Sequence, residues 1–176
     1  MDSIHTSFPK HHRVLALDLA TKTGWATLED GILKCGTEHF IRRKGRRTKE
    51  DEHEGIQYSR MEIWLWKFLG ELQPDMVVFE ETAGHFKTVS ASRTAFGWRS
   101  LMMACCARKS IPTVSVAAGT VKKYATGSGR AEKAEMIHAA KLKFVGLDIA
   151  DDNAADAVHI LCYGMSTKYQ LESFLI

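Results

Sequence analysis

The chain has 176 residues, of which 45% are hydrophobic, and a formal net charge of +3 at pH 7. This length fits a single globular domain with a sizeable core, and a pI of about 8.7 is compatible with nucleic-acid binding but is weak evidence for it. No apolar stretch approaches the length of a membrane span, and the first residues lack the apolar core of a signal peptide, so we expect a soluble intracellular protein.

The N-terminal half predicts an antiparallel meander. Residues 14–20 and 22–28 are expected strands, and Asp30 with Gly31 supplies a hairpin turn into a third strand at about 32–40. Residues 1–12 are expected to form a flexible arm, 13–166 the folded domain, and 167–176 a C-terminal tail.

Helices and strands alternate after the meander. A helical apolar face ends before Pro74 and consists of Met61, Trp64, Leu65, Phe68, Leu69 and Leu72. Further strands are expected at 75–81 and 111–117, and helices at about 92–109, 117–125, 131–144 and 153–166. The pattern predicts an α/β fold with a mixed five-stranded sheet flanked by helices.

A basic segment at 41–55 separates the meander from the first helix. It contains Arg42, Arg43, Arg46 and Arg47. Such a run is either a solvated loop or a mobile arm that neutralises backbone phosphates, and the sequence leaves both readings open. The four cysteines lack paired CxxC spacing, which favours reduced core thiols over zinc ligands or disulfides.

Carboxylates interrupt the apolar pattern at three separate places. Asp18 ends the first strand, Glu80 and Glu81 end the fourth, and "DDNAADAVHI" (151–160) opens the last helix. A buried ionised carboxylate is costly unless a partner or metal compensates it. Several acids that converge from separate segments therefore suggest a bound cation.

The last helix presents pairs of oxygen ligands on one face. Asp152 and Asp156 lie four residues apart, about 40° around the helix axis, and Asn153 lies three residues before Asp156. Asp151 and Asp152 also suit helix capping, whereas Asp156 lies beyond the first turn. Glu80 or Glu81 has the alternative of an exposed strand end, and Asp18 that of a turn former.

Hard oxygen ligands select Mg²⁺ or Mn²⁺ over zinc. Two such ions, bridged by carboxylates, activate a water molecule and stabilise the leaving oxygen in phosphodiester cleavage. Asp18 is the expected bridging ligand. The segment "TVKKYATGSGRAEK" (120–133) places a flexible backbone and basic residues near a helix N-terminus, which is a reasonable phosphate cradle. Its basic residues are Lys122, Lys123, Arg130 and Lys133.

Four segments occur in the order and at spacings typical of one family: "LALDLATKTGWA", "MVVFEE", "VKKYATGSGRAEKAEMIHAA" and "NAADAVHI". Together they resemble the RuvC-like Holliday-junction resolvases, most closely the short phage and prophage-type members, within the ribonuclease H-like superfamily. The resemblance extends from about residue 14 to 163 and implies a ribonuclease H-like fold.

The resemblance assigns the family's metal ligands residue by residue. Its first-strand aspartate matches Asp18, its fourth-strand glutamate Glu80, and its final-helix aspartate Asp156. Many bacterial members carry another acid three residues before the last one, where this chain has Asn153. Asp152 is the natural substitute, and an Asn153 oxygen is the alternative ligand.

The resemblance also implies DNA contacts. Basic residues that match Lys122 and Lys133 contact DNA near the scissile phosphate, and Lys133 is a candidate for catalysis. Phe86 is the candidate for stacking among unpaired bases, with core packing or a dimer contact as the alternatives. Lys87 flanks it, and Arg93 and Arg99 are further candidates for phosphate contacts.

The implied function is a metal-dependent endonuclease that nicks four-way and other branched DNA junctions symmetrically. It implies two Mg²⁺ or Mn²⁺ ions, 5′-phosphate and 3′-hydroxyl ends, a homodimer, and a cytoplasmic location in a bacterial or phage-infected cell. A ribonuclease H-type enzyme on RNA–DNA hybrids and a non-catalytic junction-binding protein are the alternatives. An actin-like phosphotransferase would need a second lobe, for which the chain is too short.

Overall fold

The computed structural model describes residues 4–5, 12–40, 54–81 and 88–169. Within these ranges six strands form one mixed sheet in the order β1-β4-β3-β2-β5-β6. The strands are β1 (Ile4–His5), β2 (Val14–Asp18), β3 (Lys22–Glu29), β4 (Ile32–His39), β5 (Met76–Glu80) and β6 (Thr113–Val116).

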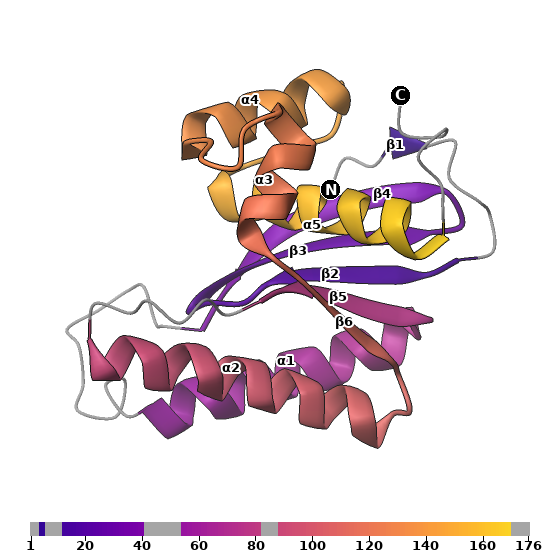
Figure 1. Cartoon of the computed structure of the whole chain (residues 1–176). Coiled ribbons are helices and arrows are strands. Elements are labelled where there is room, and N and C mark those ends of the chain that lie inside the picture. The colour runs from indigo at the N-terminus through magenta and orange to yellow at the C-terminus, as the bar shows by residue number, and fades with distance from the viewer. Residues whose placement is uncertain (1–3, 6–11, 41–53, 82–87, 170–176) are drawn as a thin grey trace.

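Helices cover both faces of the sheet (Figure 1). Below it in that view lie α1 (Glu54–Leu72) and α2 (Val89–Arg108), and above it lie α3 (Ala118–Thr126), α4 (Lys133–Lys143) and α5 (Asp152–Tyr169). The expected α/β class, the meander and the flanking helices are confirmed. Among the described helices, none is both long enough and apolar enough to span a membrane.

The meander forms as the sequence predicts, because its turn residues adopt the required conformation. Asp30 and Gly31 both have positive φ, at 51° and 79°, which is the geometry of a two-residue hairpin that follows the strand twist. Strand β2 ends earlier than predicted, at Asp18. The Thr23 hydroxyl donates to the Ala20 carbonyl at 2.6 Å, which closes a turn directly after that aspartate.

The sheet contains one strand that the sequence did not predict. β1 pairs antiparallel with β4, with Ile4 opposite Leu33 and His5 opposite Ile32. It falls inside residues 1–12, which were expected to form an arm, and it makes the sheet six-stranded rather than five-stranded. Two residues are too few to produce a periodic pattern, so this pairing depends on tertiary context.

Alternation along the central strands divides the core into two clusters. Val14 and Ala16 of β2 pack with α5, in what we call the α5 cluster. Leu15 and Leu17 pack with α1 and α2, in the α1–α2 cluster. Because side chains alternate between the faces of a strand, the next residue on the α5 side is Asp18. The residue pattern therefore aims this carboxylate at α5.

Helix α5 packs unusually closely on the meander. A Cβ added at Gly24 of β3 would overlap the backbone carbonyl of Asn153. The inward stripe predicted for this helix is confirmed, because Ala154, Ala157, Val158 and Leu161 are fully buried. Glycine at position 24 thus sets how close the acid-bearing first turns of α5 lie to the sheet.

Candidate active site

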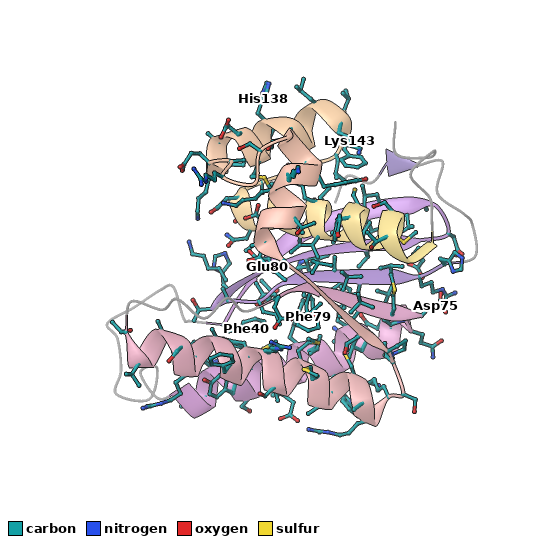
Figure 2. All side chains as sticks on the ribbon, viewed as in Figure 1. Phe40, Asp75, Phe79, Glu80, His138 and Lys143 are labelled. Atoms are coloured by element: carbon teal, nitrogen blue, oxygen red, sulfur yellow. The ribbon has the colours of Figure 1, made fainter. Side chains whose placement is uncertain are left out.

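One cavity of about 300 Å³ collects the main acids predicted from the sequence. Asp18 from β2, Glu80 from β5 and Asp156 from α5 line it, together with Lys122 of α3 and Lys133 of α4. The remaining lining residues are Ala118, Val121 and Met136. Figure 2 labels Glu80 where the end of the sheet meets the base of α3.

The fold brings the strand acids together through register and alternation. β2 and β5 are parallel neighbours, with Leu17 opposite Phe79, so Asp18 and Glu80 follow at the same edge of the sheet. Val78 packs in the α5 cluster and Phe79 in the α1–α2 cluster, which places Glu80 on the α5 side. Both strand acids therefore face the helix that carries Asp156.

Burial and the charges of neighbouring carboxylates raise the pKa values of all three cavity carboxyls. Burial, then the charges of Glu80 and Asp156, raises the pKa of Asp18 to about 7. Burial followed by the Asp156 charge raises the pKa of Glu80 to about 7. The pKa of Asp156 rises to about 6 because of burial and then the charge of Asp152. Carboxyls that repel one another in a half-buried cavity are suited to hold a cation.

The donor set fits a hard divalent cation by chemistry and position. Carboxylate oxygens are the ligands that Mg²⁺ and Mn²⁺ prefer. Within the described ranges, however, no group of three or more His, Cys, Asp or Glu side chains has the arrangement of a metal site. The candidate ligands are thus identified by their shared cavity and their repulsion, and not by a closed coordination shell.

Neither candidate for the fourth ligand lines the cavity. Lys133 forms a hydrogen-bonded ion pair with Asp152, and this contact holds the pKa of Asp152 below its usual range. The Asn153 amide donates to Asp152 at 3.4 Å. The charge of Asp152 still contributes to the raised pKa values of Asp18 and Asp156.

Asp151 has the capping role that the sequence offered as an alternative to metal binding. One of its carboxylate oxygens accepts from the backbone N–H of Ala154 at 3.0 Å and from the hydroxyl of Thr37 at 2.6 Å. It therefore caps α5 and ties the helix start to β4. Glu81, the neighbour of Glu80, is paired with Arg99 of α2.

The predicted basic residues separate into two groups. Lys122 lines the cavity and donates to the Ala131 carbonyl at 2.9 Å, and its charge opposes the raised pKa values of Glu80 and Asp156. Lys123, Arg130 and Arg93 are exposed and lie outside the cavity lining. The remaining predicted DNA contacts, Arg42, Arg43, Arg46, Arg47, Phe86 and Lys87, lie outside the described residues.

Lys22 is a basic residue near the site that the sequence reasoning missed. It is exposed at the first position of β3, and its charge contributes to the lowered pKa of Asp152. Its place in "DLATKTG", four residues after Asp18, was the available signal. Lys22 and Lys133 thus both act electrostatically on the same aspartate.

No protein-family model matches this chain. Curated relatives do. A crossover junction endodeoxyribonuclease RuvC of Rickettsia akari is 34% identical over 161 residues, covering 88% of this chain and 99% of the relative. The RuvC protein of Rickettsia conorii is 31% identical over 159 residues, with 88% and 98% covered.

Solved structures share the fold. The Thermus thermophilus RuvC structure superposes with a TM-score of 0.65 at 19% identity, covering 90% of this chain and 96% of that one. The yeast mitochondrial Holliday junction resolvase Ydc2 gives a TM-score of 0.60 at 16% identity, covering 96% and 83%. The extent and identity of the Rickettsia matches show that this chain belongs to the RuvC family of crossover junction endodeoxyribonucleases.

Proposed function

We propose that the protein is a metal-dependent endonuclease that resolves four-way DNA junctions and other branched DNA by symmetric paired nicking. The observation that carries the proposal is the shared cavity of Asp18, Glu80 and Asp156, with Lys122 and Lys133 at its wall. The curated relatives are crossover junction endodeoxyribonucleases, and a related Thermus thermophilus RuvC structure contains a Holliday junction substrate.

The cavity residues divide the chemistry between charge and position. Asp18 is the candidate bridging ligand, because the charges of both Glu80 and Asp156 raise its pKa. Glu80 and Asp156 are the candidate flanking ligands. A fourth oxygen would come from Asp152 or Asn153. Two Mg²⁺ or Mn²⁺ ions held there would activate the attacking water and stabilise the leaving oxygen. Cleavage on this plan leaves 5′-phosphate and 3′-hydroxyl ends.

The lysines supply the phosphate contacts in this proposal. Lys133 and Lys122 line the same cavity as the acids, so a phosphate that enters it meets both cations. Lys123, Arg130, Arg93, Lys87 and the basic segment of Arg42, Arg43, Arg46 and Arg47 are proposed to contact the junction arms. Phe86 is proposed to stack on an unpaired base.

Two symmetric cuts require two active sites related by a two-fold axis. We therefore propose a homodimer, whose symmetry matches that of a four-way junction. We also propose a cytoplasmic location. The phage-type affiliation and the division into an arm (1–12), a nuclease domain (13–166) and a tail (167–176) stay predictions.

The proposal is tested with a labelled immobile four-way junction in Mg²⁺ or in EDTA. Wild type is compared with Asp18→Asn, and Asp151→Asn is the matched control because asparagine keeps the helix cap outside the cavity. We expect paired nicks at symmetric positions that EDTA and Asp18→Asn abolish and that Asp151→Asn retains. An RNA–DNA hybrid of the same sequence is run in parallel.

Other outcomes identify the alternatives. Preferential cleavage of the hybrid would mean a ribonuclease H-type enzyme. Tight, metal-independent junction binding with no nicking in Mg²⁺ or Mn²⁺ would mean a binding protein, and Asn153, which stands where many members have an acid, would be the first residue to examine.

A further inference from the structure

Strand β5 ends at Glu80, and Glu81 follows directly after it, on the opposite side of the sheet. Val78 packs in the α5 cluster and Phe79 in the α1–α2 cluster, so Glu80 faces α5 and Glu81 faces α1 and α2. A shift of one residue in register would exchange the two side chains. Contacts that hold Glu81 on the other face therefore favour the register that places Glu80 in the cavity.

Glu81 is held by three contacts from two neighbouring elements. Its carboxylate forms an ion pair with the guanidinium of Arg99 on α2 and a side-chain hydrogen bond with Ser115 of β6. Its backbone N–H donates to the Val116 carbonyl at 2.7 Å. The chain is therefore held against α2 and β6 for one residue beyond the end of β5.

Arg99 is itself fixed against the sheet. Its guanidinium carbon lies 5.4 Å from the ring centre of Phe79, on the same face as Glu81, and its side chain is only 27% exposed. A planar guanidinium that stacks on a ring and pairs with a carboxylate defines a position more sharply than a lysine does. Arg99 thus links α2 to the last residues of the strand.

We propose that Arg99 and Glu81 are positioning residues that keep Glu80 in the metal-binding cavity. The inference rests on the proposed function and adds to it a set of contacts on the opposite face of the sheet. It also reassigns Arg99, which the sequence suggested as a phosphate contact. Mutation of a group that orients a metal ligand typically lowers metal affinity or activity by about 10- to 100-fold.

The test compares Arg99→Met, Glu81→Gln and the conservative Arg99→Lys. Arg108→Met is the matched control, because Arg108 lies on the same helix and forms an ion pair with Glu62 of α1 at 3.1 Å, away from the cavity. For each full-length protein, three quantities are measured: the thermal shift produced by Mg²⁺ alone, junction affinity in EDTA, and junction cleavage.

We expect Arg99→Met and Glu81→Gln to raise the Mg²⁺ concentration for half-maximal thermal shift and cleavage by about 10-fold or more. Arg99→Lys should restore part of the loss, Arg108→Met should resemble wild type, and junction affinity in EDTA should not change. Melting temperatures in EDTA separate this effect from a general loss of folding.

Two results would overturn the inference. If Arg99→Met weakens junction binding in EDTA while Glu81→Gln changes nothing, Arg99 is a phosphate contact. If both variants keep the wild-type Mg²⁺ response and cleavage, the pair has no positioning role. A wild-type protein that responds to Mg²⁺ but cleaves no junction would count against the proposed function alone.

Discussion

Glu80 lies beside Asp18 at the ends of two parallel strands, and its charge adds to the burial that raises the pKa of Asp18 to about 7. Two neighbouring carboxylates that are both ionised repel each other and destabilise the folded chain unless a cation binds between them. The site therefore carries a cost in stability that metal binding or neutralisation removes, and this relationship yields the first two predictions.

Metal-free protein should become less stable as the pH rises from about 4 to about 7. The folded pKa values of Asp18, Glu80 and Asp156 lie above their ordinary values, so in this window these three carboxyls bind more protons in the folded state than in the unfolded state. Their combined effect outweighs that of His159, the lowered pKa of which acts in the opposite direction. By linkage, the free energy of unfolding then falls as pH rises. Thermal melts in EDTA across this range measure the effect, and added Mg²⁺ should remove most of it. A flat profile would contradict the raised pKa.

Asp18→Asn should stabilise the metal-free protein at pH 7.5 while it abolishes cleavage. The substitution removes a charge that Glu80 and Asp156 repel. We expect a gain of about 1–2 kcal/mol, which is roughly 2–8 °C in melting temperature for a domain of this size. The variant should also lose most of its Mg²⁺-induced thermal shift. A lower melting temperature in EDTA would mean that Asp18 makes a stabilising contact instead.

The sequence predicted the fold well where side-chain periodicity and turn chemistry act locally. Asp30 and Gly31 specify their hairpin by themselves, and the apolar stripe of α5 is buried as expected. β1 was missed because only its partner strand makes it a strand. Long, regular elements can be recognised from their own residues, whereas a two-residue edge strand cannot.

Part of the candidate site was predictable for a related reason. Asp18, Glu80 and Asp156 each interrupt an apolar pattern, and the cavity brings all three together. The pairing of Glu81 with Arg99 and that of Asp152 with Lys133 join residues 18 and 19 positions apart. Such pairs depend on how α2 and α4 pack, which the spacing of charges along the chain does not reveal.

The fourth metal ligand can be identified from the first turn of α5. We expect Asp152→Asn to raise the Mg²⁺ concentration required for cleavage by about 10-fold. The reason is that the charge of Asp152 acts on the cavity acids and raises the pKa values of Asp18 and Asp156. Asn153→Ala should have a smaller effect. Mg²⁺ titrations of cleavage measure both. The reverse order would assign the ligand to Asn153, and Asn153→Asp then becomes the informative gain-of-charge variant.

Lys133→Ala should separate catalysis from stability. The Lys133 side chain is 77% exposed, and exposed ion pairs typically contribute about 0–1 kcal/mol, so the melting temperature should change little. Cleavage should fall by about 100-fold, within the usual range for loss of a charge that stabilises the reacting phosphate. Lys141→Ala, at an exposed position later on α4, is the control. Equal cleavage by the two variants would remove Lys133 from the candidate catalytic set.

Gly24→Ala should loosen the docking of α5, because the added Cβ would overlap the Asn153 carbonyl. We expect a loss of about 2 kcal/mol or more, since backbone atoms on both sides must move, together with weaker Mg²⁺ binding. Gly70→Ala is the matched control: the nearest atom to its new Cβ is Lys109 Nζ at 3.6 Å, and alanine favours the helix. Thermal melts with and without Mg²⁺ test both, and similar behaviour of the two variants would contradict the close-packing argument.

Lys22 should contribute to DNA binding although the sequence reasoning passed over it. Its exposed position at the start of β3 and its electrostatic effect on Asp152 place a cation near the site that is not part of α3 or α4.

If Lys22 contacts a phosphate, the slope of log K against log salt concentration should be smaller in magnitude by about 0.9 in Lys22→Ala than in wild type, whatever the junction sequence. Junction affinity in EDTA is measured at several salt concentrations, with Lys67→Ala of the exposed Lys67–Glu71 pair on α1 as control. If Lys22→Ala keeps the wild-type salt dependence and differs only in its Mg²⁺ requirement, Lys22 acts through Asp152 and not through the DNA backbone.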